Sequence, residues 1–89
     1  MLVRRRLVVH GVVQGVGFRA WIWRTASQRG VSGRARNRAD GTVEVVLEGE
    51  PDAVDAVVRI CREGPRSAVV TEVEVFEEEP EGLSGFSAG

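Results

Sequence analysis

Apolar and polar residues alternate along several short stretches of this chain, and two longer stretches carry apolar residues at helical spacing. Alternation at every second position is typical of a strand with one buried face, whereas recurrence every three or four positions is typical of a helix with one buried stripe. Seventeen valines among 89 residues strengthen the case for strands, because β-branched side chains favour extended backbone. The pattern therefore predicts a domain of mixed α and β structure.

Four strands are expected, over residues 4–13, 32–39, 42–48 and a stretch around 69–76. The dipeptide Asp40-Gly41 separates the second strand from the third, and such a dipeptide between alternating stretches favours a tight hairpin turn. The middle of the sheet is therefore expected to contain a hairpin.

Two helices are expected between the strands. The first covers residues 18–29, before Gly30, and the second begins at Pro51 and ends before Gly64. Their apolar stripes consist of Phe18, Ile22 and Ala26 in the first helix and Val54, Val57, Val58 and Cys61 in the second.

The resulting order, β-α-β-β-α-β, packs most simply as one sheet with both helices on one face, which is the ferredoxin-like arrangement of the α+β class. A chain of this length forms a single domain, residues 1–89. We expect an antiparallel or mixed sheet of four to five strands. The sequence does not decide whether the segment 83–89 forms a fifth strand, because Leu83 and Phe86 are its only large apolar residues.

Charge is divided unevenly along the chain. Before Ala39 there are nine arginines and no acid, and from Ala39 onward there are three arginines and 13 acids. The predicted fold explains most of this division, because cross-strand pairs of opposite charge each contribute about 0.2 to 1 kcal/mol. On the open face of the sheet we expect Arg4 and Arg6 beside Glu44, Glu48, Glu72 and Glu74, and Arg34, Arg36 and Arg38 opposite the glutamates across the hairpin.

The compartment is expected to be the cytoplasm. Cys61 is the only cysteine, so the chain offers no internal disulfide that would favour an oxidising compartment. No stretch reaches the roughly 18 apolar residues of a membrane-spanning helix. We therefore expect no membrane partner.

A glycine-rich turn before the first helix is the strongest candidate for chemistry. The segment 11–19 places Gly11, Gly15 and Gly17 ahead of a helix, and Arg19 lies in its first turn. Glycines let successive backbone N–H groups converge, and a helix N-terminus adds partial positive charge, so this segment can hold a phosphate or carboxylate. A turn of this kind serves tight packing about as often, so the residues alone leave both interpretations open.

Two separated blocks of the sequence resemble the acylphosphatase family. The first is Gly11-x-Val13-Gln14-Gly15-Val16-Gly17-Phe18-Arg19, and the second is Gly33-x-x-Arg36-Asn37-x-x-Asp40-Gly41-x-Val43. A third stretch, Gly64-Pro65-x-Ser67-Ala68-x-Val70, is similar to the family's entry into the fourth strand. The second block departs from the usual pattern at Arg34, where the family commonly has a tryptophan.

The resemblance implies an enzyme, a hydrolase that converts an acyl phosphate to a carboxylate and inorganic phosphate. It implies that Arg19 binds the phosphate, that Asn37 orients the attacking water, and that neither a metal nor another cofactor takes part. The backbone N–H groups expected to hold the phosphoryl oxygens are those of Gln14, Gly15, Val16, Gly17 and Phe18. A small acyl phosphate is the expected partner, nucleic acid is not, and a monomer is expected.

Three other functions are alternatives to acyl phosphate hydrolysis. An RNA-binding module shares the element order but needs aromatic residues on the open faces of two central strands. A silent ligand-binding module and a domain of a larger hydrogenase-maturation protein are further alternatives. We expect His10 to be structural, Cys61 to lie in the core, and one of Trp21 and Trp23 to be half exposed.

Overall fold

A computed structural model describes residues 1–88 of the chain. Its elements follow the expected order, with one further strand at the end. They are β1 (Val3–Val12), α1 (Phe18–Gln28), β2 (Ser32–Asn37), β3 (Val43–Gly49), α2 (Pro51–Glu63), β4 (Val69–Glu78) and β5 (Phe86–Ala88).

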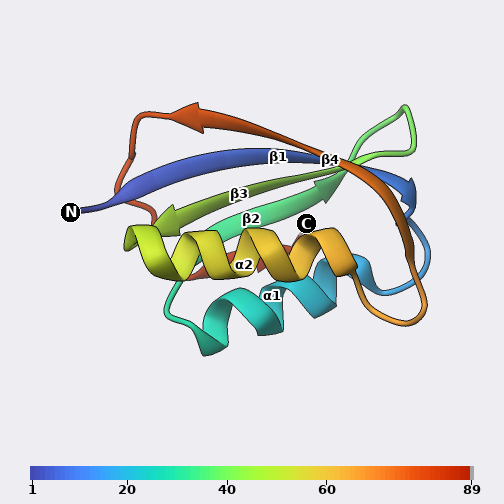
Figure 1. The fold of residues 1–89 in the computed structure, drawn as a ribbon, viewed down its shortest axis with the longest axis horizontal. Helices are drawn as coiled ribbons and strands as arrows, with labels where there is room; N and C mark the ends of the chain where they lie inside the picture. The colour runs from blue at the N-terminus through green and yellow to red at the C-terminus, as the bar shows by residue number, and fades with distance from the viewer. Residues whose placement is uncertain (89) are drawn as a thin grey trace.

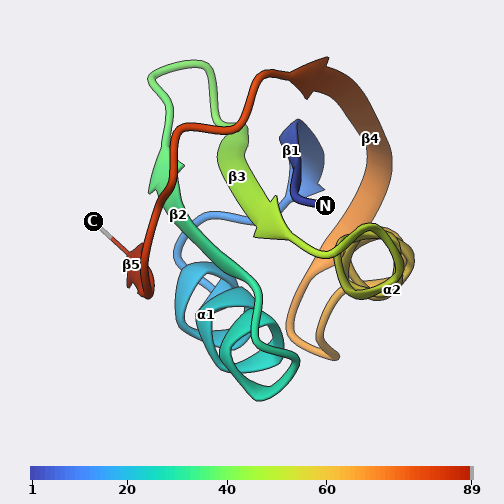
Figure 2. The ribbon, with the colours of Figure 1, turned by 90° about the vertical axis from the view of Figure 1, so that its left-hand side faces the viewer.

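One twisted sheet carries both helices on the same face (Figures 1 and 2). The strand order is β4-β1-β3-β2-β5; the first four strands pair antiparallel with their neighbours, and β5 runs parallel to β2. The ferredoxin-like arrangement is therefore confirmed. The open question about the segment 83–89 is answered by β5, although Gly89 lies outside the described residues.

The core lies between the sheet and the two helices. Both predicted helical stripes contribute to it, because Phe18, Ile22 and Ala26 of α1 and Val54, Val57 and Cys61 of α2 are all buried. Among the strands, alternate residues point inward, including Leu7, Val9, Val43, Val45 and Leu47. In the described part of the chain, no helix is long and apolar enough to cross a membrane.

The opposite face of the sheet is more buried than the sequence indicates. Val8 and Val46 are buried there, and the Arg4 side chain is only 5% exposed. Arg4 binds Glu48 as predicted, but its second partner is Glu78. The expectation that Glu72 and Glu74 would flank Arg4 and Arg6 was wrong, because the register of β1 on β4 places Arg4 opposite Glu78 and Arg6 opposite Phe76.

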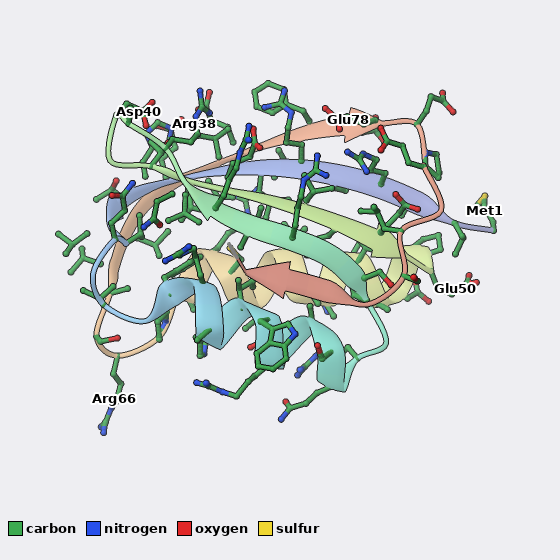
Figure 3. All side chains as sticks on the ribbon, turned by 180° about the vertical axis from the view of Figure 1, so that it is seen from behind. Met1, Arg38, Asp40, Glu50, Arg66 and Glu78 are labelled. Atoms are coloured by element: carbon green, nitrogen blue, oxygen red, sulfur yellow. The ribbon has the colours of Figure 1, made fainter. Side chains whose placement is uncertain are left out.

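Three loops gather at one end of the molecule. They are the β1–α1 loop, the β2–β3 hairpin turn and the α2–β4 loop, which lie together at the right of Figure 1. In the reverse view, Arg38 of the hairpin and Arg66 of the α2–β4 loop mark this end, and Met1 and Glu50 mark the other (Figure 3). The predicted site residues belong to the first two of these loops or border them.

Candidate active site

A hollow of about 240 Å³ opens between the β1–α1 loop, the start of α1 and the end of β2. Its lining consists of Val13, Gly15, Gly17, Phe18, Arg19, Ala20 and Asn37. Residues from both sequence blocks therefore meet in one place, although Arg19 and Asn37 lie far apart in the sequence. Val13 and Ala20 had not been expected at the site; only their position beside the glycine turn points to them.

The glycines of the turn are required by backbone conformation. Gly15 and Gly17 have φ angles of 73° and 80°, in the left-handed region that other residues rarely adopt. A Cβ atom built on either residue would meet nothing within 4 Å, so space is not the constraint. These two bends carry the chain from the end of β1 into α1 within five residues.

The N-terminus of α1 faces the hollow with polar groups available. Gly17 caps the helix without a side chain, and the Trp21 N–H donates to the Gly17 carbonyl at 3.1 Å. The N–H groups of the first turn therefore have no partner within the helix, and no acid lies in that turn. Arg19 adds its guanidinium there, and among residues 1–88 it forms no ion pair with a carboxylate. This is a region of concentrated positive potential.

Asn37 approaches the hollow from the other side. It is the last residue of β2, lies opposite Val43 of β3, and is exposed to solvent. The hairpin that follows is stiffened by Asp40, whose carboxylate accepts hydrogen bonds from the Thr42 hydroxyl at 2.6 Å and the Thr42 N–H at 3.0 Å. The same two bonds lower the pKa of Asp40. Asp40 therefore stays ionised and continues to order the turn at neutral pH.

Gln14 and Val16 are not among the residues that line the hollow. The Gln14 side-chain amide donates to the carbonyls of Arg38 and Thr42, at 2.8 and 2.9 Å. The Val16 carbonyl accepts a hydrogen bond from the Ser67 hydroxyl at 2.7 Å. The loop is thus held from the hairpin on one side and from the α2–β4 loop on the other. Ser67 was part of the third sequence block, but no role had been assigned to it.

Other chemically capable side chains lie outside the hollow. His10 contacts Glu74 at 2.7 Å on the opposite face of the sheet, and that hydrogen bond raises the pKa of His10. Cys61 is buried in the core, and burial raises the pKa of its thiol to about 12. Trp23 is 46% exposed while Trp21 packs against the core, as expected. Within residues 1–88, no group of three or more His, Cys, Asp or Glu side chains is placed to hold a metal.

Comparison with known proteins decides the family. The family model described as acylphosphatase matches residues 5–88, nearly the whole chain. This chain belongs to the acylphosphatase family. An acylphosphatase of Thermococcus kodakarensis is 54% identical over 84 residues, which cover 94% of this chain and 92% of that protein. An acylphosphatase of Trichormus variabilis is also 54% identical, over 85 residues that cover 96% and 84% of the two chains.

Solved structures of acylphosphatases have the same fold. The crystal structure of the Bacillus subtilis acylphosphatase superimposes with a TM-score of 0.94 at 38% identity, covering 100% of this chain and 99% of that one. Full-length HypF, in a phosphate- and nucleotide-bound form, matches all of this chain with 12% of its own length, at a TM-score of 0.88 and 26% identity. The fold therefore occurs both as a separate acylphosphatase and as a segment of a much larger protein.

The RNA-binding alternative finds no support on the sheet. Recognition of that kind stacks bases on aromatic side chains of the central strands. Neither β1 nor β3 contains an aromatic residue, and the open face of β1 presents arginines, Val8 and His10. Arg4 and Arg6 are engaged with glutamates there, so few cations of this face remain for a polyanion.

Proposed function

We propose that this chain hydrolyses the carboxyl-phosphate bond of acyl phosphates, with Arg19 and the adjoining backbone N–H groups binding the phosphoryl group and Asn37 orienting the attacking water. Membership of the acylphosphatase family supports the reaction. The roles are supported by one observation: Arg19, the glycine turn and Asn37 line the same hollow.

The binding half of the site suits a phosphoryl group. Its oxygens carry negative charge that spreads further as the bond to the carboxylate lengthens, and fixed donors stabilise that charge best. The turn at Gly15 and Gly17 and the start of α1 offer backbone donors, and Arg19 offers a planar guanidinium that can bind two oxygens at once. Phe18 contributes through its backbone, because its ring is buried in the core.

The water-positioning half needs little acid or base strength. A carboxylate is a good leaving group, so the reaction depends mainly on orientation and on stabilising the phosphoryl charge. The amide oxygen of Asn37 can accept a hydrogen bond from water, but an amide does not remove a proton. The proton passes to the substrate phosphate or to solvent. The rate is therefore expected to vary little with pH near neutrality, and a steep bell between pH 5 and 8 would speak against this mechanism.

The test is hydrolysis of benzoyl phosphate in excess chelator by the wild-type chain and by Asn37→Ala. The wild type is expected to be active, and the variant to lose about 100-fold or more in kcat, because the water loses its orienting group. Arg59→Ala, on the exposed side of α2, is the control and is expected to match the wild type. Wild-type inactivity would refute the reaction, and near-normal kcat in Asn37→Ala would refute the role of Asn37.

A further inference from the structure

The side chain of Gln14 joins two parts of the site that the strands leave unconnected. The β1–β3 ladder ends at Val9 opposite Val43, before the glycine turn begins. Beyond that pair, the Gln14 amide nitrogen reaches across to the hairpin and donates to the carbonyls of Arg38 and Thr42. Because both partners are carbonyl oxygens, only the NH₂ end of the amide can satisfy them, and both of its hydrogens are used.

The two carbonyls lie where the hairpin closes. Arg38 donates its own N–H to the Thr42 carbonyl at 2.9 Å, so Gln14 binds the pair of residues that forms the base of the turn. Arg38 directly follows Asn37, and Gln14 directly precedes Gly15; Asn37 and Gly15 both line the hollow. One side chain therefore connects the phosphoryl-binding turn to the strand end that carries Asn37.

We infer that Gln14 is a positioning residue that sets the distance between the phosphoryl-binding turn and Asn37. This inference rests on the proposed function. Attack on phosphorus requires the water in line with the leaving group, and a displacement of about 1 Å from such geometry can cost 100-fold in rate. Both side-chain donors of Gln14 are committed to the hairpin, so the side chain is not free to bind substrate.

The second anchor of the turn acts in another direction. The Ser67 hydroxyl binds the Val16 carbonyl from the α2–β4 loop, on the side away from the hairpin. Ser67 therefore orders the turn without fixing Asn37 relative to it. The two anchors predict different consequences, and Gln14 is the one whose loss alters the alignment of water and phosphoryl group.

The primary test is Gln14→Met, which keeps the length of the side chain but removes both donors without adding charge. The same change at the exposed Gln28 of α1 serves as the control. We measure kcat with benzoyl phosphate, the inhibition constant of inorganic phosphate, and the midpoint of urea unfolding. Gln14→Met is expected to lower kcat about 10- to 100-fold and to change the phosphate inhibition constant by less than about threefold. Gln28→Met is expected to leave kcat and the phosphate inhibition constant unchanged.

A positioning role also predicts strong non-additivity. In an Asn37→Ala background, measured at high enzyme concentration, Gln14→Met should reduce kcat by less than about threefold, because the group it positions is already gone. An unchanged kcat in the single variant overturns the inference. So does an equal loss in both backgrounds, or a phosphate inhibition constant that rises as much as kcat falls, since these mean that Gln14 shapes the turn itself.

A measurement without catalysis separates this inference from the proposed function. In the ¹⁵N-labelled wild type, inorganic phosphate is expected to shift the NMR signals of the Gly15 and Gly17 amides and of the Asn37 side-chain amide. In Gln14→Met the glycine signals should still shift, while the Asn37 response is lost. A response of Asn37 that is unchanged in the variant, or that is missing in the wild type, overturns the inference even if hydrolysis is confirmed.

Discussion

Arg4 and Arg19 have the same side chain in opposite surroundings. The Arg4 side chain is 5% exposed and lies within ion-pair distance of Glu48, Glu78 and Glu81, at 3.0 to 3.6 Å. Arg19 lies at the start of a helix whose first turn has no acid. One guanidinium is neutralised within the fold, and the other forms no ion pair within residues 1–88, as its proposed role in binding a phosphoryl group requires.

Arg4 and Arg19 differ in whether an acidic side chain lies beside the guanidinium. Glu48 is buried, and besides Arg4 it accepts backbone N–H bonds from Glu81, Gly82 and Leu83. Burial alone would raise the pKa of Glu48, but these N–H groups and Arg4 together lower it. An acid beside Arg19 would instead compete with a phosphoryl group for the same donors. An even distribution of charge would therefore work against binding an anion at the site.

The largest expected effect is at Arg19. Arg19→Met removes the planar fork from the hollow and is expected to lower kcat/KM about 1,000-fold, since removing one charge-stabilising donor typically costs 100- to 1,000-fold and this one is charged. The unfolding midpoint should change little, because Arg19 forms no ion pair in the described part of the fold. Arg24→Met, five positions along the same helix and exposed, is the matched control for kinetics. If Arg19→Met and Arg24→Met have comparable kcat/KM, the proposed difference between Arg19 and Arg4 is wrong.

Arg4→Met should show the reverse. It leaves the buried Glu48 without its cation, and breaking a buried pair in this way costs about 3 kcal/mol in the free energy of unfolding. Activity per folded molecule should stay near the wild-type value, because the site lies in the loops at the other end of the sheet. Urea unfolding followed by tryptophan fluorescence measures the first quantity, and benzoyl phosphate hydrolysis under stabilising conditions the second. A loss of kcat without a loss in the free energy of unfolding would mean that Arg4 takes part in catalysis, and the proposed difference from Arg19 would be wrong.

Acid is expected to weaken the contacts that Glu48 makes with Arg4 and with the N–H groups of Glu81, Gly82 and Leu83, by a smaller amount than the loss of Arg4. Because the pKa of Glu48 is lowered in the folded state, its contribution to stability is present above about pH 4.3, the ordinary pKa of a glutamate, and is lost as the pH falls through the lowered value. The free energy of unfolding should therefore fall below about pH 4.3, and Glu48→Gln should make that fall shallower. Glu78 and Asp40 also have lowered pKa values and will keep part of the slope. Identical slopes would show that Glu48 is not the group that titrates.

The main elements were predictable from the pattern of the sequence. Alternation and helical spacing located four strands and both helices within a few residues of their observed bounds, and the predicted order gave the sheet with its two helices. The register was harder, because alternation decides which face a residue occupies but not which residue lies opposite it. That is why Glu78 was missed as the partner of Arg4, although the face was correct.

The last strand and the support of the site depend on backbone groups, which carry no sequence signal. The segment leading to β5 is held by Glu48 through the N–H groups of Glu81, Gly82 and Leu83, so the identity of those residues matters little. In the same way, Gln14 bonds to two carbonyls more than twenty positions away. The glycine turn, Arg19 and Asn37 could be singled out from the two sequence blocks, because each block names the residues themselves, and all of them line one hollow.

The ion pairs of Arg4 with Glu48 and Glu78 also limit how early in synthesis this part of the sheet can form. The Arg4 partners Glu48 and Glu78 are 44 and 74 residues further along the chain, so during synthesis β1 is made before either of them. Within residues 1–40, nine arginines are also made before Asp40, the first acid of this stretch. Until β3 has been made, β1 has no neighbouring strand, and Arg4 has no carboxylate partner. The charge pairing around Arg4 is thus complete only after Glu78 and Glu81 have been made.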